Sequence, residues 1–149
     1  MAKPKLTFKI EGSKELQRKF NAIATKKSKE TKEHINKTAI NIQKGAKKRT
    51  RRVDNGDMRA GWVIEPYRSG FSVDVMNRVE YAVYHEYGTG IYAQHPKIPG
   101  RKTPWVYRDP KTKELVFTRG ITPMPMLRPS FDENKKDFEK GIERIYKDL

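Results

Sequence analysis

The sequence contains no cysteine, so disulfide bonds and thiolate metal sites are excluded. It has no apolar run close to the ~20 residues that a membrane-spanning helix needs. Residues 1–5 lack the apolar segment of a secretory signal peptide. Hydrophobic residues make up 35% of the chain and charged residues 34%, which indicates a modest core under a large polar surface. We therefore expect a soluble protein that is synthesised in the cytoplasm and does not enter a membrane.

The sequence also lacks the patterns that common enzyme classes need. It has no Gly-x-Ser-x-Gly nucleophile elbow and no glycine-rich phosphate loop. His85 and Glu86 stand together, but a zinc helix of the His-Glu-x-x-His type would need histidine at position 89, which is threonine. Asp54 and Asp57 flank an Asn-Gly turn, and turn formation explains them better than magnesium binding does. We predict no catalytic residue, no metal and no cofactor.

What the chain has in excess is positive charge, and it lies near the N-terminus. The formal net charge is +15, and residues 1–52 hold 17 Lys and Arg against 4 Asp and Glu. We predict a basic face at the end of this segment, made of Lys44, Lys47, Lys48, Arg49, Arg51 and Arg52. Such a face attracts phosphates or an acidic protein surface. A solvated helical face explains the same charges equally well.

The first third of the chain has mainly helical periodicity. Alternation over residues 6–10 predicts a short strand, which Gly12 ends. Ser13 is expected to cap a basic helical region over residues 13–50, along which apolar residues recur at helical spacing. The strongly polar stretch 25–33 interrupts this pattern, so the region is either one long helix or two.

The middle of the chain predicts a hairpin followed by a short helix. After the turn at residues 53–57, strands over 59–64 and 71–75 should pair in antiparallel fashion. The stretch from Tyr81 to Thr89 is the densest aromatic cluster in the chain. We expect a short helix there, with a strand as the alternative, and Tyr81 and Tyr84 in the core. Glu86 is expected to form an ion pair with Arg59.

The rest of the chain predicts a projecting region and a last helix. A loop over 91–104 and a β-hairpin of 105–108 with 115–118 should protrude as one unit over residues 88–120. Three prolines favour an extended chain over 121–129, after which Ser130 is expected to cap a C-terminal helix over 130–149. Residues 1–149 are thus predicted to form a single α+β domain. Its antiparallel sheet would have about four strands, with both long helices packed on one face.

Three segments give the chain its resemblance to a known family: residues 53–62, 77–90 and 123–130. Their order resembles that of the neck or tail-completion (head–tail joining) proteins of long-tailed bacteriophages, which include minor capsid and tail-component proteins. The resemblance spans residues 13–149. The residues that match the family pattern are Asp54, Gly56, Arg59, Trp62, Asn77, Tyr81, Ala82, Glu86, Pro125, Arg128 and Pro129.

The resemblance implies a structural, non-enzymatic virion protein at the head–tail junction, synthesised in the host bacterial cytoplasm. Its partners would be a connector or stopper, a tail terminator or tail tube, and further copies of itself in a ring, with a monomer in isolation left open. A ring needs head-to-tail contacts that close. For these we predict Gly88, Thr89, Gly90, Ile91, Tyr92, Lys97, Arg101 and Trp105.

Since DNA passes through the neck, the resemblance also allows non-specific contact between the basic face and genomic DNA. The charge keeps one alternative open, a basic nucleic-acid-binding protein such as a small nuclease.

Overall fold

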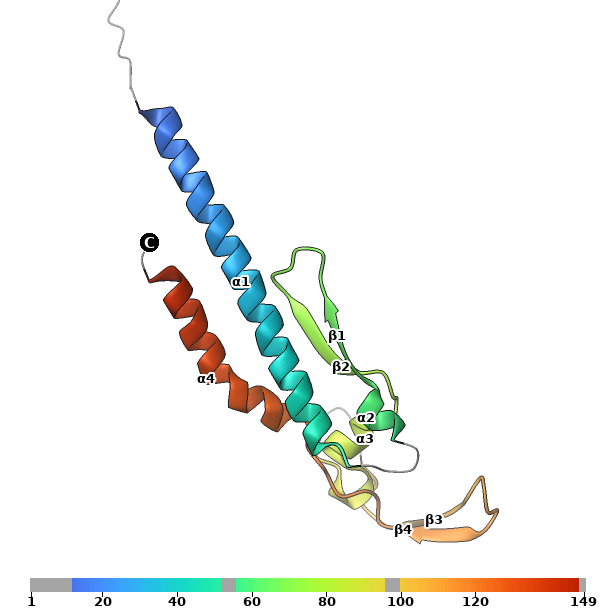
Figure 1. The fold of residues 1–149 in the computed structure, drawn as a ribbon. Coiled ribbons are helices and arrows are strands. Elements are labelled where there is room, and N and C mark those ends of the chain that lie inside the picture. The colour runs from blue at the N-terminus through green and yellow to red at the C-terminus, as the bar shows by residue number, and fades with distance from the viewer. Residues whose placement is uncertain (1–11, 52–55, 96–99, 148–149) are drawn as a thin grey trace, which may run out of the picture.

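The computed structural model describes residues 12–51, 56–95 and 100–147 (Figure 1). The strand expected at residues 6–10 lies outside these ranges. The elements are helices α1 (Ser13–Arg49), α2 (Asp57–Ala60), α3 (Ala82–Tyr87) and α4 (Leu127–Tyr146), strands β1 (Trp62–Pro66), β2 (Val73–Asn77), β3 (Trp105–Arg108) and β4 (Leu115–Thr118), and a 3₁₀ turn at Gly90–Tyr92. The described chain is α+β, as predicted.

Helix α1 is one continuous helix of 37 residues, which decides between the two alternatives that the sequence left open. The polar stretch does not break it. Along this stretch Lys26 lies 4.0 Å from Glu30 and Lys29 lies 3.9 Å from Glu33, pairs one turn apart that add weak support to the helix. The expected cap is wrong. The N-cap is Gly12 in a left-handed conformation, which offers no side chain for a capping hydrogen bond, and Ser13 is the first residue of the helix.

Helix α4 runs antiparallel to α1 and packs along it (Figure 1). At one end the hydroxyl groups of Thr31 and Tyr146 lie 2.9 Å apart. In the middle the ring of His34 stacks on Phe138, with ring centroids 5.4 Å apart. Gly141 faces the imidazole of His34 so closely that an added Cβ would collide with it. Helix α4 therefore covers one side of α1 from about residue 27 onward.

Strands β1 and β2 form an antiparallel hairpin that packs on α1, and their predicted pairing is confirmed. The register runs from Trp62 opposite Asn77 to Pro66 opposite Val73. The first strand starts later than expected, because residues 57–60 form the short helix α2. Gly56, with φ of 84°, provides the left-handed residue that precedes this helix.

A small core lies where the end of α1, α2, β1, α3 and the start of α4 meet. Its buried hydrophobic side chains are Ala46, Met58, Trp62, Ala82 and Met126. The indole Nε1 of Trp62 donates a 2.8 Å hydrogen bond to the Thr50 hydroxyl, which itself donates to the carbonyl of Ala46. These bonds satisfy the polar atoms that the core encloses.

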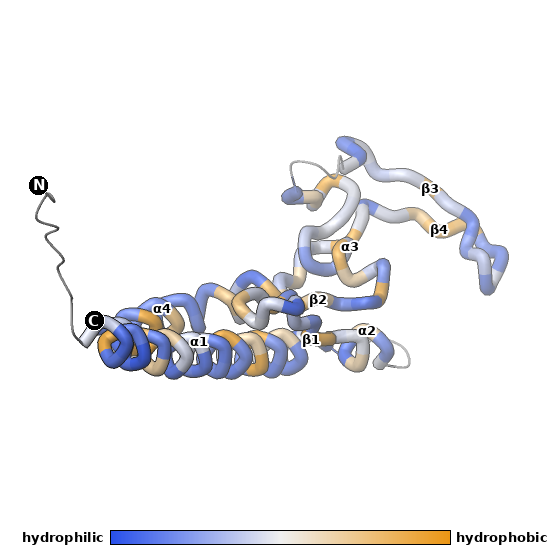
Figure 2. Tube along the Cα trace, turned by 90° about the horizontal axis from the view of Figure 1, so that it is seen from above, coloured by the Kyte–Doolittle hydropathy of each residue, from blue (hydrophilic) through white to orange (hydrophobic). Residues whose placement is uncertain are grey.

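The predicted single sheet of about four strands is wrong. The four described strands form two separate two-stranded sheets, β1–β2 and β3–β4. The second hairpin forms from the predicted residues, but it lies apart from α1 and α4 in both Figure 1 and Figure 2. The two long helices pack chiefly on each other, and α1 is the one that packs along both strands of the first sheet.

The short helix α3 forms as predicted, but the prediction of buried tyrosines is wrong. Tyr81 and Tyr84 are exposed, and the buried residue of this helix is Ala82. Ala82 and Glu86 are four residues apart and share the face that turns toward the core. Tyr84, two residues after Ala82, lies on the opposite side of the helix and faces away.

Candidate assembly surfaces

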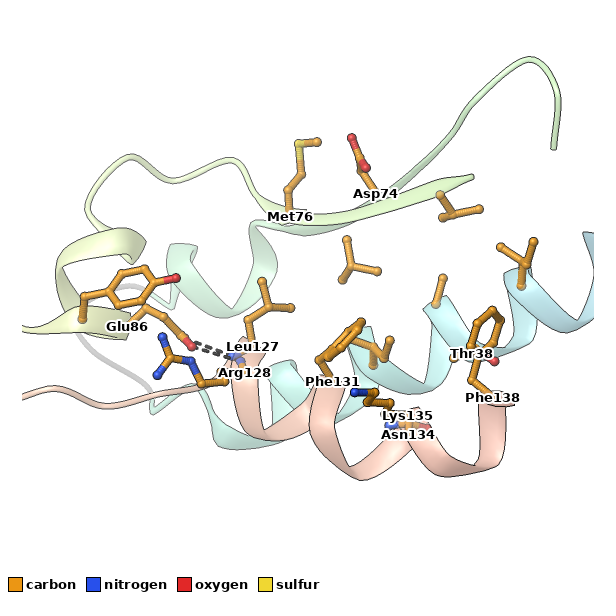
Figure 3. Close-up of a pocket in the computed structure, with 16 residues that line it drawn as sticks. Thr38, Asp74, Met76, Glu86, Leu127, Arg128, Phe131, Asn134, Lys135 and Phe138 are labelled. Carbon is orange, nitrogen blue, oxygen red and sulfur yellow. Dashed lines mark hydrogen bonds between the residues drawn. The ribbon is translucent and has the colours of Figure 1, made fainter. Parts of the chain in front are cut away.

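Glu86 fastens α3 to the start of α4 (Figure 3). Its carboxylate accepts hydrogen bonds from the backbone N–H groups of Met126 at 2.6 Å and of Leu127 and Arg128 at 3.0 Å. The carboxylate therefore caps the N-terminus of α4 and complements the helix dipole there. The expected ion pair between Glu86 and Arg59 is wrong, since this carboxylate serves backbone groups instead.

This capping explains why the last helix begins earlier than the prolines suggested. Helix α4 begins at Leu127 and includes Pro129 as its third residue, so both the extended segment predicted up to 129 and the start at Ser130 are wrong. Proline has no N–H to lose in the first turn of a helix. Ser130 is buried inside the helix and donates a 2.6 Å hydrogen bond to the carbonyl of Met126.

The projecting region, which we call the arm, consists of residues 91–119 and is held at its base by paired backbone segments. The N–H of Thr89 donates to the carbonyl of Ile121 at 2.9 Å, and the N–H of Ile121 donates to the Thr89 hydroxyl at 2.9 Å. Next along the chain, the N–H of Ile91 donates to the carbonyl of Arg119 at 3.1 Å. These bonds join the two ends of the arm.

Gly88 and Gly90 make this close pairing possible. Both have positive φ, 74° and 62°, and an added Cβ at either one would collide with the backbone of the returning segment. The other residues predicted for assembly lie further out. Ile91 and Tyr92 are exposed in the 3₁₀ turn, and the guanidinium of Arg101 lies 5.2 Å from the centre of the half-buried Trp105 ring. Lys97 lies outside the described residues.

The β3–β4 hairpin has two different faces. In its register Val106 pairs with Phe117, and Arg108 pairs with Leu115, which places these four side chains on one face. Val106, Leu115 and Phe117 are 57%, 69% and 63% exposed. We call these three residues the free face. They were missing from the predicted assembly residues, although the alternation of the strands identifies them as neighbours.

The tip of this hairpin is ordered by one carboxylate. Asp109 Oδ1 accepts hydrogen bonds from the backbone N–H groups of Lys111 at 2.7 Å and Thr112 at 3.0 Å. The bond from Thr112, and then the bond from Lys111, lower the pKa of Asp109 below its ordinary value. The turn therefore depends on the charged form of this side chain.

A groove of about 670 Å³ separates β2 from the two long helices (Figure 3). Most of its walls are apolar side chains, Ile35, Ala39, Ile42, Val73, Val75, Leu127, Phe131 and Phe138 among them. Four charged side chains also line it, two acidic (Asp74 and Glu86) and two basic (Arg128 and Lys135). Phe131 points into the groove and is still 52% exposed. The groove is thus an apolar concavity that the described residues leave open.

The predicted basic face is only partly assembled in the structure. Lys44, Lys47 and Lys48 form no ion pair within the described parts of the chain, and Arg51 is exposed. Arg49 is turned toward α4, where its guanidinium pairs with Glu133 and donates to the Ser130 hydroxyl at 3.1 Å. Arg52 lies outside the described residues.

Several residues of the family pattern hold the junction between these surfaces. The Asn77 side chain donates to the carbonyl of Met58 at 2.7 Å and accepts from the N–H of Val79 at 3.0 Å. The guanidinium of Arg128 lies 5.6 Å from the centre of the Tyr87 ring. Pro125 lies on the surface just before α4, whereas Asp54 lies outside the described residues. The pattern residues seen here act through packing and backbone contacts.

Metal binding and membrane insertion are two further properties on which the described residues bear. Over residues 12–51, 56–95 and 100–147, no group of three or more His, Cys, Asp or Glu is placed to hold a metal ion. Within the same ranges, none of the helices combines the length and apolar character needed to cross a membrane.

Part of the chain is similar to a known family of proteins. A family model described as "Bacteriophage HK97-gp10, putative tail-component" matches residues 14–88. The match covers α1, the first sheet and α3, and it ends at the base of the arm. No curated protein and no solved structure matches the chain.

Proposed function

This chain belongs to the HK97-gp10-like family of bacteriophage tail components, and we propose that it acts in head–tail joining or tail completion as a ring-forming component of the neck. The match supports the first and coarser part of this statement, a structural tail component of the virion. The family match gives no support to the alternative of a small nuclease. The position at the junction and the ring are the proposal.

The observation that carries the proposal is the arm. Its ends are joined at Thr89 and Ile121, and it holds a two-stranded hairpin with an exposed apolar face away from the helices. A two-stranded hairpin alone is marginally stable in water. Contiguous exposed apolar side chains mark sites of interaction. The arm is therefore suited to contact its neighbours in the neck, which include further copies of this chain beside a connector, stopper, tail terminator or tail tube.

The deciding experiment uses phage particles made without this protein. We expect filled heads beside free tails in electron micrographs, and restoration of infectious particles when the intact chain is supplied. A phage that lacks the gene and still yields joined, infectious particles would refute the proposed function.

A second variant tests the arm itself. Gly90 and Gly120 lie next to each other in the structure, so residues 91–119 can be excised by joining these two glycines. We expect the shortened chain to retain its helical circular dichroism and cooperative unfolding, because the described core lies outside the arm. It should fail to restore head–tail joining. Normal restoration would show that the arm is not the contact surface.

The basic side of α1 supports non-specific contact with the genomic DNA that passes through a neck. Lys44, Lys47 and Lys48 project from the helix, and none of them pairs with an acid among the described residues. Filter binding to duplex DNA should weaken steeply as salt is raised. Replacing all three lysines by glutamine should reduce the slope, whereas the same change at the ion-paired Lys19, Lys26 and Lys29 is the matched control.

A further inference from the structure

We propose that the free face of the β3–β4 hairpin of one copy inserts into the groove between β2, α1 and α4 of the next copy. This inference rests on the proposed ring and names the contact that joins its subunits. It commits to a second copy of this chain as the occupant of the groove.

One of the two surfaces projects and the other is hollow. The free face lies on a hairpin that projects away from α1 and α4, and its apolar side chains are exposed. The groove is a concave apolar surface of about 670 Å³ between a strand and two helices. Phe131 lies in this groove and is 52% exposed, which leaves an aromatic surface that an inserted apolar side chain would remove from water.

The hairpin cannot fill the groove of its own chain. Its base is fixed by the hydrogen bonds of Thr89 with Ile121 and of Ile91 with Arg119, and both views show the hairpin apart from α1 and α4. The two surfaces can therefore meet only between copies. Reciprocal insertion between two copies would give a closed dimer, whereas insertion from each copy into the next gives a heterologous contact, which forms a ring when the rotation between copies closes. The proposed contact is the second of these arrangements.

Charge favours this place of contact over the rest of the surface. Copies with a net charge of +15 repel one another, so they approach best where positive charge is low. The groove is lined by two acidic and two basic side chains and is balanced. On the hairpin, Arg108 is the charged neighbour of the free face, and its guanidinium donates to the carbonyl of Lys113 at 2.9 Å. An apolar contact here buries no uncompensated acid or base from the free face itself.

Disulfide cross-linking tests the contact directly, because the chain has no cysteine of its own. A phage would carry a chain with both Phe117→Cys and Phe131→Cys, two exposed positions that leave the core intact. Its particles would be oxidised and examined on non-reducing gels. We expect a ladder of covalently linked copies that collapses to one monomer band on reduction.

The matched control pairs Phe117→Cys with Ile40→Cys. Ile40 is exposed on α1 and lies outside the groove. The control chain should give at least tenfold less cross-linked product than the chain with Phe117→Cys and Phe131→Cys. Equal yields from the two chains would overturn the proposed contact, and so would a cross-link from the thiol introduced at position 117 to a different virion protein.

The outcomes separate this inference from the proposed function. If deletion of the gene blocks head–tail joining but the ladder is absent from particles that contain the variant, only the hairpin-in-groove contact is wrong. If particles join normally without the gene, the neck function is wrong, and the ring contact that rests on it is wrong as well.

Discussion

The two β-hairpins of this protein are built alike and placed differently. Both are antiparallel pairs of short strands in simple register. The first has α1 packed along both strands, and its Trp62 is only 4% exposed. Among the described residues, neither α1 nor α4 packs along the second, and its Leu115 is 69% exposed. The comparison shows that local sequence pattern makes a hairpin, whereas tertiary contacts decide whether its apolar face belongs to a core or to an interface.

A consequence is that stability and assembly should separate between the two hairpins. Apolar side chains of the first hairpin contribute their burial to the folded monomer. Those of the second contribute little until a partner covers them. Substitutions in each hairpin and at the start of α4 can separate the two contributions.

The largest effect is expected from Trp62→Ala. The substitution removes a buried indole from the core and its hydrogen bond to Thr50, so the free energy of unfolding should fall by about 3–5 kcal/mol. Urea denaturation followed by circular dichroism measures the change. The matched variant is Phe117→Ala in the second hairpin, for which we expect a loss within about 0.5 kcal/mol. Equal losses in both hairpins would contradict the comparison.

A smaller but substantial effect is expected from Glu86→Ala, at the contact between α3 and the start of α4. Three backbone N–H groups at the start of α4 would lose their acceptor, and the free energy of unfolding should fall by about 2 kcal/mol. Glu86→Gln should lose less because the amide oxygen still accepts. The control is Glu80→Ala, an exposed carboxylate just before α3, with an expected change within about 0.5 kcal/mol. Unchanged amide hydrogen exchange at Leu127 in Glu86→Ala would refute the capping role.

The free face should affect assembly while leaving the monomer almost unchanged. For the double variant Leu115→Ser with Phe117→Ser we expect a free energy of unfolding within about 1 kcal/mol of the wild type, since both side chains are already in water. Infectious titre should nevertheless fall by several orders of magnitude if the hairpin makes the subunit contact. Lys111→Ser at the hairpin tip is the control and should support wild-type titre.

The smallest effect concerns the pH response of the hairpin tip. The backbone N–H groups of Thr112 and Lys111 lower the pKa of Asp109. The carboxylate therefore stabilises the turn above the ordinary aspartate pKa, and this stabilisation is lost as the pH falls through the lowered folded value. NMR titration of the Lys111 and Thr112 amide protons should show a midpoint below 3.8, the ordinary pKa of the group. A midpoint at or above 3.8 would mean that these hydrogen bonds are not maintained in solution.

Much of the fold follows from the sequence because it depends on local patterns. Alternation placed both hairpins, and helical spacing placed α3 and the apolar side of α1. The prediction of a single sheet was wrong because the pattern of residues in each strand does not show which hairpins pack together. The prediction that Tyr81 and Tyr84 are buried was wrong because a helix as short as α3 buries one narrow face. Ala82 and Glu86 occupy that face.

The start of α4 was missed for a different reason. The acceptor that caps this helix, Glu86, lies 40 residues before Met126 in the chain. The sequence around the prolines therefore contains no local signal for where the helix begins. The groove could not be predicted from the sequence either, since its walls come from four separate elements, α1, β2, α3 and α4. Half of the free face could be read from the sequence, because alternation puts Leu115 and Phe117 on one side of their strand. Its union with Val106 needed the register of the hairpin, which the structure provides.

The joined base of the arm has a consequence for how such a protein can change. Because the chain leaves the body at Thr89 and returns beside it at Ile121, the length between these points is nearly free to vary. Doubling a closed loop costs only about 0.6 kcal/mol of entropy. Insertions, deletions and whole exchanges of hairpin can accumulate there while the core remains as it is. Replacement of one contiguous stretch of the gene would thereby give the same core and long helices a different projecting surface.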